Sequence, residues 1–383
     1  MASVVPTDID GRWTVSQVRK VGSLTIDEHR VDIRPKLPVS RLFFLFGYAQ
    51  RRRLWLAEDT QLDSAPDLVP AIAIAFLRKL SVAVAQGLLQ GYRERLESDT
   101  VVRGRIDFVE QFKQRPGLAS PLELRFDEFT VDIDENRILA AALERLLRLP
   151  LLDPASRRKL LHFRGMFVEV EALPRGLPLP PTRENRRNEH YQPALSLARL
   201  ILANTSIEHS VGEHTASAFL VDVAQVFEDF VSAALRESLE SSGGRVLSQR
   251  SDRLDVSGHA VVRPDIVWQR HEQIDAVIDA KYKAEKPTGY PNADLYQMAT
   301  YCTRYGLRDG HLVYASGEET PKTVSIIGAP ITVHCHALEL TGSPEEILAS
   351  VDRVAGAIVT SAPVEAPWSA TRRSPSSAVP RRG

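Results

Sequence analysis

The chain has 383 residues, of which 43% are hydrophobic and 25% are charged, and this length suffices for two packed domains of about 100 to 200 residues each. The formal net charge of -1 excludes a protein-wide positive field, so any contact with nucleic acid must come from local basic patches. The two cysteines form no CxxC pair, which argues against a disulfide framework or a zinc ribbon. With no signal peptide and no membrane span predicted, we expect a cytoplasmic protein.

The first half of the chain mixes strand and helix patterns. Residues 12 to 40 alternate apolar and polar side chains, which predicts two or three strands, and a helix is expected over residues 41 to 50. Asp63 or Ser64 can cap a long helix that extends to about Ser98. A strand over residues 122 to 131 and helices over residues 135 to 147, 154 to 163 and 193 to 204 follow. We expect an N-terminal domain, a β unit plus helices, over residues 1 to 205.

The second half has the element order of an α/β sandwich. Helices are predicted over residues 221 to 239, 293 to 305 and 344 to 359, and strands over residues 245 to 248, 260 to 268, 276 to 282, 310 to 315 and 331 to 340. We therefore expect an α/β domain over residues 206 to 360. Residues 361 to 383 are rich in Ser, Pro, Ala and Arg and lack periodicity, which predicts a disordered tail.

The stretch from residue 261 to 283 carries the chemistry. It is predicted to form two short apolar strands joined by a polar turn, with Asp265 on the first strand and Asp279 and Lys281 on one face of the second. Two carboxylates can hold a hard cation such as Mg²⁺, and a lysine ammonium can orient a water or neutralise a scissile phosphate. The alternative is a surface hairpin in which Asp279 and Lys281 form a weak ion pair. The apolar neighbours favour a buried sheet, where unpaired charges would be costly.

Two predicted helices add polar side chains. Glu228 has apolar neighbours on its helix face, a costly position unless a metal or a lysine compensates the charge; the alternative is a marginal position paired with an arginine. Gln297 and Tyr301 are four residues apart and therefore share one helix face. A glutamine can position a phosphate or a water and a tyrosine can contact a nucleic-acid backbone, although such a pair is otherwise ordinary helix surface and core.

Other polar residues are less specific. Local positive charge near the hairpin is offered by Arg250, Arg263, Lys283 and Lys286. His334 and His336 lie two apart on a predicted strand and could bind a metal, but without a further ligand nearby an ordinary strand face is favoured. The chain contains no GxxxxGK[ST] motif, so any nucleotide-driven motor must be another polypeptide.

Taken together, these motifs resemble the PD-(D/E)xK nuclease superfamily, in the branch with a QxxxY motif that is shared with RecB-type nucleases. The resemblance is carried by Glu228, Pro264-Asp265, Asp279-Ala280-Lys281 and Gln297-x-x-x-Tyr301. More narrowly, the chain resembles the McrC family, the nuclease subunits of modified-cytosine-dependent restriction systems. The strings that support this, in order over residues 20 to 315, are VGSLTI, DIRPKL, RGRIDF, DENRIL, FLVDVAQVFEDFV, RPDIVW, IDAKYK and DLYQMATY.

The resemblance implies a PD-(D/E)xK domain that acts as an Mg²⁺-dependent DNA endonuclease in antiviral defence. It implies a GTP-hydrolysing AAA+ partner of the McrB type, which binds the GTP, recognises DNA carrying modified cytosine and is stimulated by the N-terminal domain of this chain. The implied metal ligands are Glu228, Asp265, Asp279 and Ala280, with Lys281 catalytic and Gln297 and Tyr301 auxiliary. Two alternatives stay open: a mainly non-catalytic activator or adaptor of an AAA+ motor, and a stand-alone RecB-type repair nuclease.

Overall fold

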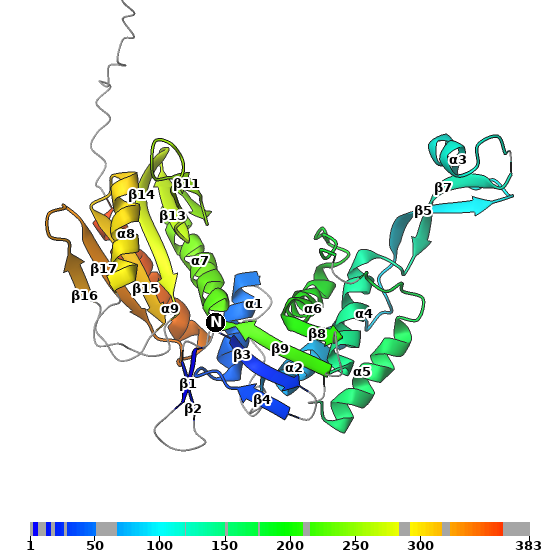
Figure 1. Ribbon diagram of the computed structural model, residues 1–383, viewed down its shortest axis with the longest axis horizontal. Helices are drawn as coiled ribbons and strands as arrows, with labels where there is room; N and C mark the ends of the chain where they lie inside the picture. The colour runs from blue at the N-terminus through cyan, green and yellow to red at the C-terminus, as the bar shows by residue number, and fades with distance from the viewer. Residues whose placement is uncertain are drawn as a thin grey trace, which may run out of the picture. The chain divides into compact units, whose positions relative to one another are not determined.

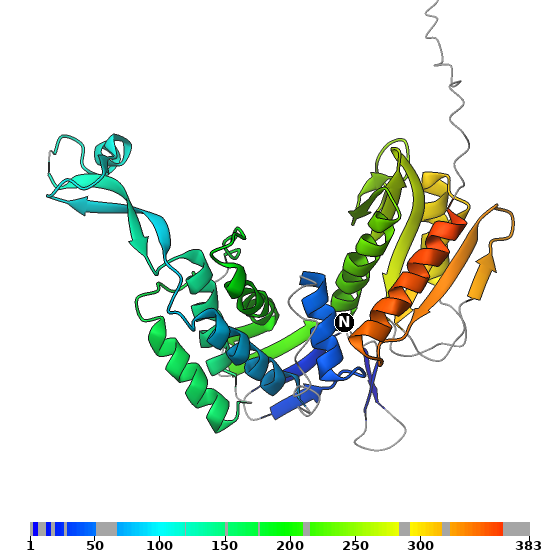
Figure 2. The same cartoon turned by 180° about the vertical axis from the view of Figure 1, so that it is seen from behind.

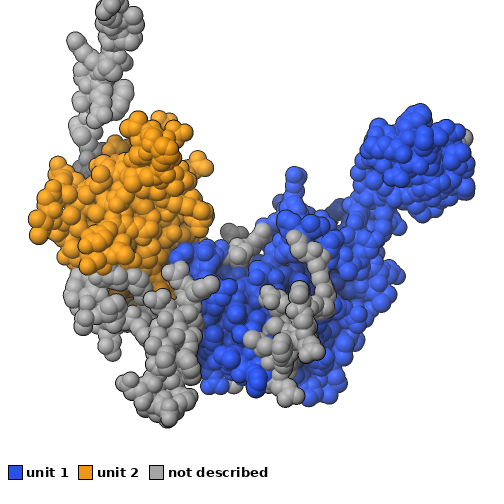
Figure 3. All heavy atoms as spheres, viewed as in Figure 1, with its two compact units in different colours: residues 1–230, 340–344 blue, residues 231–339, 345–383 orange. Residues whose placement is uncertain are grey.

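The computed structural model describes residues 3–6, 13–16, 20–26, 29–50, 67–118, 120–149, 152–174, 177–209, 215–282, 292–315 and 322–362. The chain forms two compact units, one of residues 1–230 with 340–344 and one of residues 231–339 with 345–383 (Figure 3). The division falls inside helix α7 (Val223–Ser241), and the sequence-based boundary at residue 206 stays a prediction. Lys283, Lys286 and all of the expected tail beyond residue 362 lie outside the described residues.

The first unit contains a four-stranded antiparallel sheet in the order β4-β3-β9-β8. Its strands are β3 (Lys20–Ile26), β4 (His29–Ile33), β8 (Thr205–His209) and β9 (Thr215–Asp222), and β1 (Ser3–Pro6) pairs separately with β2 (Trp13–Ser16). Where β3 meets β9, Gly22 has φ 137°, and a Cβ there would lie 2.0 Å from the carbonyl oxygen of Phe219. Only glycine allows this approach, so the pairing depends on it.

The helices of the first unit, arranged as in Figure 1, bury an apolar core. They are α1 (Val39–Gln50), α2 (Leu68–Ala83), α4 (Asp134–Leu147), α5 (Pro154–Met166), the 3-10 turn η3 (Glu189–Tyr191) and α6 (Gln192–Asn204). Ile72, Phe76 and Leu80, at helical spacing on α2, are fully buried, and α2 and α4 both pack on α6. The helices predicted over residues 41 to 50, 135 to 147, 154 to 163 and 193 to 204 are thus confirmed.

A small β-rich element extends from this helical body. It consists of β5 (Gly91–Asp99), β6 (Arg105–Ile106), α3 (Phe108–Gln114) and β7 (Leu122–Thr130), with the strands in the antiparallel order β5-β7-β6. The strand predicted over residues 122 to 131 is confirmed, but the expected helix up to Ser98 is wrong. α2 ends at Ala83, and Gly87 with φ 94° reverses the chain before β5 begins. The helical apolar spacing stops at Val84, and β5 is stabilised by its pairing with β7 along its whole length.

The second unit is built on a six-stranded mixed sheet in the order β10-β13-β14-β15-β17-β16. The pairs β14-β15 and β15-β17 are parallel, and the others are antiparallel. The elements are β10 (Arg245–Ser248), β11 (Asp252–Arg253), β12 (Val261–Val262), β13 (Ile266–Arg270), β14 (Gln273–Lys281), α8 (Asn292–Tyr305), β15 (Asp309–Ala315), β16 (Lys322–Ser325), β17 (Thr332–Leu338) and α9 (Pro344–Ser361). The mixed α/β architecture expected from the sequence is confirmed, with β16 as an additional strand.

Helices cover both faces of this sheet. Figure 1 shows α8 in front of the strands, whereas Figure 2, seen from behind, shows α9 and α7 in front. On the α8 side, Met298 and Cys302 pack on Val277 and Leu312, all of them fully buried. Because side chains alternate along a strand, Asp279 and Lys281 share the face of Val277 and point toward α8. None of the helices in the described ranges is long and apolar enough to cross a membrane.

Candidate active site

The predicted hairpin forms the centre of the second unit's sheet. β13 and β14 pair antiparallel with Ile266 opposite Ile278, and His271 and Glu272 form the connecting turn with φ 45° and 65°. Positive φ at both turn residues is typical of a tight hairpin whose twist matches that of the strands. The register brings Asp265 and Asp279 to the next opposing positions, beyond the last paired residues. The alternative of a surface hairpin is therefore wrong, because both strands have a neighbour on each side.

Asp279 and Lys281 form an ion pair that is largely shielded from solvent. The side chain of Asp279 is 2% exposed and that of Lys281 is 21% exposed, so solvent screens their attraction less than it would on the surface. Asp279 Oδ2, the oxygen that faces Lys281 Nζ, has no hydrogen-bond partner of good geometry among the described residues. A buried carboxylate oxygen held only by an ammonium is available to a further cation.

Asp265 is held beside Asp279 by the backbone of the facing strand. Its Oδ2 accepts a hydrogen bond of 2.9 Å from the N–H of Ala280, and its own carbonyl oxygen accepts one of 2.8 Å from the N–H of Gln249. A hydrogen bond from a backbone N–H to a carboxylate oxygen fixes the orientation of the carboxylate. The strand that carries Asp279 and Lys281 thus also orients the second carboxylate.

The electrostatics of Lys281 reflect these neighbours. Burial on its own would lower the pKa of the Lys281 ammonium, but the carboxylates of Asp279, Asp265 and Asp294 outweigh burial and raise that pKa above its usual value. Lys281 is therefore protonated at neutral pH. It acts as a fixed positive charge and a hydrogen-bond donor at this site.

Helix α8 brings Gln297 and Tyr301 to the base of the hairpin. Gln297 Nε2 donates to Tyr301 Oη at 2.8 Å, and Tyr301 Oη donates to the carbonyl oxygen of Arg263 at 3.2 Å. Burial and the nearby charge of Asp279 raise the pKa of the Tyr301 phenol, so it stays protonated. The pair predicted to share a helix face is thus joined by a hydrogen bond, and Tyr301 fixes the backbone two residues before Asp265.

Sequence reasoning missed two residues of this cluster. Asp294, in the first turn of α8, is 7% exposed, and its Oδ2 accepts a 3.0 Å hydrogen bond from Tyr314 Oη on β15. Tyr314 is the register partner of Lys281 across the β14-β15 pair. The available signal was the spacing of Asp294 three residues before Gln297, which puts both near one helix face. An aspartate in a first turn is ordinarily read only as a partner of the helix dipole.

The structure leaves the expectation for Glu228 open. Glu228 is half-buried on α7, between the fully buried Phe227 and the exposed Asp229. It belongs to the first unit, whereas the other predicted site residues belong to the second. Its role as a metal ligand stays a prediction.

The carboxylates of Asp265 and Asp279 suit a cation whose remaining ligands are water and substrate. Across the described ranges, no group of three or more His, Cys, Asp or Glu side chains is arranged to hold a metal ion. Mg²⁺, however, is commonly held by one or two carboxylates together with waters and substrate phosphates. The paired carboxylates of Asp265 and Asp279, with the hydrogen-bond-deficient Oδ2 of Asp279, fit that chemistry.

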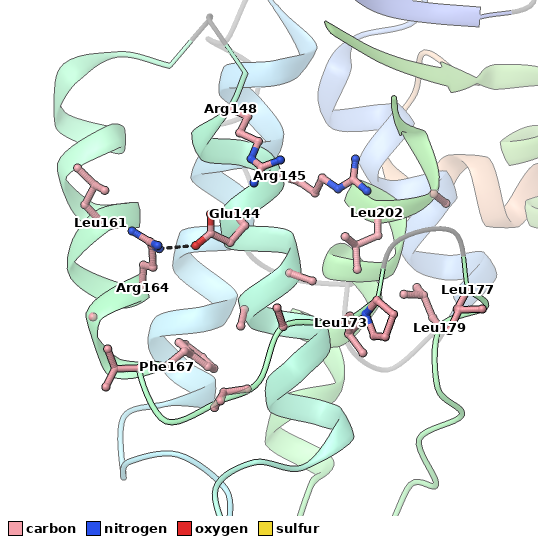
Figure 4. A pocket seen from close by; sticks show the side chains of 18 residues that line it. Glu144, Arg145, Arg148, Leu161, Arg164, Phe167, Leu173, Leu177, Leu179 and Leu202 are labelled. Carbon is pink, nitrogen blue, oxygen red and sulfur yellow. Dashed lines mark hydrogen bonds and ion pairs between the residues drawn. The ribbon is translucent and has the colours of Figure 1, made fainter. Parts of the chain in front are cut away.

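The large pocket of the first unit contains none of the predicted site residues. Its volume is about 900 Å³, and α4, α5, α6 and the segment after α5 enclose it (Figure 4). Apolar side chains such as Leu161, Phe167 and Leu173 line it, and Glu144 and Arg164 form an ion pair at its edge. This lining lacks the carboxylate and lysine cluster found at the hairpin.

Two solved structures contain chains that are similar to this one. This chain is similar to a chain of the refined half-complex from a tetradecameric assembly of Thermococcus gammatolerans McrB AAA+ hexamers with bound McrC, at 18% identity over 88% of this chain and 83% of that chain, with a TM-score of 0.54. The likeness shows a shared fold. A chain of the cryo-EM structure of the Thermococcus gammatolerans McrBC complex matches at 20% identity over 58% of this chain and 67% of that chain, with a TM-score of 0.37.

The sequence itself identifies the family. No relative is found among curated proteins. Residues 16–315, well over half of the chain, match the family model described as McrBC 5-methylcytosine restriction system component. The chain therefore belongs to the family of McrBC 5-methylcytosine restriction system components.

Proposed function

We propose that this chain is the nuclease subunit of its restriction system, a PD-(D/E)xK endodeoxyribonuclease that uses Mg²⁺. One observation carries the proposal: Asp265, Asp279 and Lys281 meet on adjacent central strands, with the two carboxylates on opposing positions and the lysine paired to the more buried one. A restriction system cuts DNA, and this cluster supplies both the cation-binding oxygens and the positive charge that phosphodiester hydrolysis needs.

Asp265 and Asp279 would hold the Mg²⁺, with the carbonyl oxygen of Ala280 as a further ligand. The metal-ligand role of Glu228 stays a prediction from the sequence. When bound, the ion supplies Lewis-acid stabilisation of the charge that develops on the phosphate and activates a water. The N–H of Ala280 keeps Asp265 oriented in advance, so that binding costs little reorganisation. The Lys281 ammonium donates to the attacking water or to a phosphate oxygen, and Gln297 with Tyr301 keeps the backbone before Asp265 in place.

Exposed arginines of the second unit support DNA as the substrate. Arg263 is exposed and stands two residues before Asp265, and its Nη2 donates to Gln249 Oε1 at 2.7 Å. Arg253 and Arg304 are exposed as well, and they are linked because Arg304 Nε donates to the carbonyl oxygen of Arg253. Arginines of this kind can contact phosphates of a duplex that carries modified cytosine, although the net charge of the chain is -1.

We propose further that a GTP-hydrolysing AAA+ protein of the McrB type is the partner, that it binds the GTP, and that the first unit docks on it and stimulates its GTPase. Two observations support this. The similar Thermococcus structure contains McrB AAA+ hexamers with bound McrC. This chain has no phosphate-binding loop motif of its own, so GTP hydrolysis has to come from another polypeptide.

The test uses the full chain together with its McrB-type partner, Mg²⁺, GTP and a plasmid with modified cytosines. Asp279→Ala and Lys281→Ala are expected to lower the cleavage rate by at least about 100-fold while GTP turnover by the partner continues. Glu272→Gln, at the exposed turn of the same hairpin, is the matched control and should cut normally. Cleavage by a folded Asp279→Ala variant at the normal rate would overturn the proposal.

The same assay separates the two alternatives. If the chain is mainly an activator or adaptor, the unmodified chain should cut DNA slowly or not at all. Lys281→Ala should then change neither that cleavage nor the GTPase activity of the partner. A stand-alone repair nuclease predicts that the unmodified chain cuts DNA at full rate when the partner is left out.

A further inference from the structure

Asp294 is a buried carboxylate to which the proposed reaction assigns no task. It lies in the first turn of α8, and Tyr314 Oη donates a 3.0 Å hydrogen bond to its Oδ2. Tyr314, half-buried on β15, therefore holds the carboxylate in one orientation. A carboxylate in a largely buried setting is costly unless its charge is matched nearby.

Lys281 is a cation of the sheet that neighbours this arrangement. β14 and β15 are parallel, and their register pairs Lys281 with Tyr314, so the two side chains are neighbours on the face that α8 covers. Asp294, on α8, is bonded to that same tyrosine. In agreement with this geometry, the charge of Asp294 contributes, after Asp279 and Asp265, to the raised pKa of Lys281.

The lysine needs a second counter-ion as soon as Asp279 binds a cation. In the structure, Lys281 Nζ faces Asp279 Oδ2, an oxygen that accepts no well-formed hydrogen bond from the described residues and can therefore bind a metal ion. A divalent cation on that oxygen repels the ammonium and competes with it for the carboxylate. Without another negative charge, Lys281 would either block the metal or leave the site.

We propose that Asp294, oriented by Tyr314, is a positioning residue that retains the Lys281 ammonium at the site when Asp279 turns to the metal ion. The inference rests on the proposed nuclease function and adds a residue to it. Asp294 touches neither the metal nor the DNA in this scheme; it acts through Lys281. It explains why a tyrosine on one strand and an aspartate on a helix converge beside a lysine that already has a partner.

A purely structural role for Asp294 makes a different prediction. An acidic residue in the first turn of a helix stabilises the positive end of the helix dipole. Such a role would change the melting temperature when the charge is removed, but it would not make metal binding depend on Lys281. Glu345, an exposed acidic residue in the first turn of α9, is the matched control for loss of charge at a helix start.

The experiment measures Mg²⁺ affinity of the full chain by calorimetry without DNA, in a double-mutant cycle of Asp294→Asn and Lys281→Met. We expect Asp294→Asn to weaken Mg²⁺ binding by about tenfold or more, because the ammonium then stays on Asp279. In the Lys281→Met background, the same replacement should have no effect on Mg²⁺ affinity. Glu345→Gln should bind Mg²⁺ like the unmodified chain. Equal losses in both lysine backgrounds, or no loss in either, overturn the inference.

Tyr314→Phe keeps the experiment decisive if Asp294→Asn does not fold. It leaves the carboxylate in place and removes only the O–H that orients it, so it should weaken Mg²⁺ binding in the same direction and by a smaller factor. Cleavage assays with the partner add a second readout: raised Mg²⁺ should rescue Asp294→Asn, but not Asp279→Ala. Normal affinity in Tyr314→Phe, with normal cleavage at low Mg²⁺, counts against the inference. An unmodified chain that binds no Mg²⁺ and cuts no DNA would instead refute the proposed function.

Discussion

Tyr301 and Arg263 lie 38 residues apart in the chain, yet the Tyr301 hydroxyl donates a hydrogen bond of 3.2 Å to the Arg263 carbonyl oxygen. Through this bond α8 is attached to the backbone just before Asp265. Two further bonds strengthen the attachment: Tyr305 Oη donates to Asp252 Oδ2 at 2.8 Å, and Arg304 Nε donates to the carbonyl oxygen of Arg253. One side of α8 thus holds the segment that leads into the candidate active site.

Tyr301→Phe tests the importance of this attachment. Phenylalanine keeps the packed ring and removes the O–H, so the free energy of unfolding should fall by about 1 kcal/mol. Cleavage should fall by roughly tenfold, because a less firmly held Asp265 departs from the geometry the reaction needs. Tyr296→Phe, at an exposed position of the same helix, is the control for a lost hydroxyl. Unchanged cleavage in Tyr301→Phe, measured beside that control, would show that the bond is dispensable.

Arg263→Ala tests the proposed DNA contact. If the guanidinium neutralises one phosphate, the variant should bind duplex DNA more weakly, and the slope of log affinity against log salt should decrease by about 1. Binding is measured by fluorescence anisotropy with EDTA present, so that no cleavage intervenes. Arg245→Ala removes an exposed arginine at the other end of the β10-β13 pair and should leave the slope unchanged. Identical slopes for the two variants would place the DNA elsewhere.

The hairpin and the α8 face could be predicted from sequence because both follow from local periodicity. Alternation of side chains placed Asp279 and Lys281 on one face, and a spacing of four placed Gln297 beside Tyr301; both relationships hold in the structure. The sequence also placed Asp265 and Asp279 on adjacent strands, but their direct opposition depends on the strand register, which only the structure gives.

Features that depend on distant partners could not be predicted in this way. β9 pairs with β3, from which almost half of the chain separates it. The last residues of β9 also have the apolar character of the helix that follows, so the sequence alone assigns them to that helix. β5 follows a helix whose apolar spacing ends at Val84, and its pairing with β7, a strand more than 20 residues further along the chain, is not visible in its own sequence. Asp294 was missed for a related reason: its burial comes from Tyr314 on another strand, which its own helix does not reveal.

Asp132 joins the small β-rich element to the helical body of the first unit. Its side chain is 1% exposed, and Arg137 Nε and Nη2 each donate to it at 2.7 Å. Arg93 from β5 also pairs with it, and the N–H of Glu171 donates to it at 3.0 Å. Burial would raise the pKa of Asp132, but the hydrogen bonds from Arg137 and its charge outweigh burial and lower that pKa.

Asp132→Ala should therefore be strongly destabilising. Removing one partner leaves the Arg137 guanidinium buried without its main counter-ion, a change that typically costs about 3 to 5 kcal/mol. Urea unfolding of the full chain measures the loss. Asp127→Ala, at an exposed position of β7, should cost less than about 0.5 kcal/mol. Similar losses for the two variants would mean that the network contributes little to stability.

Three histidines stack on the face of the second unit's sheet opposite α8. The rings of His334 and His336 lie 5.0 Å and 5.3 Å from the ring of His311, and His311 Nδ1 is 3.1 Å from His336 Nε2. Asp309 accepts from His334 Nε2 at 2.7 Å, and Ser361 Oγ at the end of α9 lies 3.2 Å from His311 Nε2. The strand face expected for His334 and His336 is thus an ordered cluster that includes His311.

The stability of the chain should decrease as the pH falls from 7 to 5. Burial, together with the neighbouring His334, lowers the pKa of His336 to about 4, whereas an unfolded histidine has a value near 6.5. Because the folded pKa is the lower one, the unfolded state takes up the proton first, and stability present above pH 6.5 is lost on acidification. For His336 alone the loss amounts to about 2 kcal/mol at pH 5. His336→Gln should flatten the pH dependence of urea unfolding, whereas His259→Gln, at an exposed position, should not. An equally steep dependence in His336→Gln would show that the proton is taken up elsewhere.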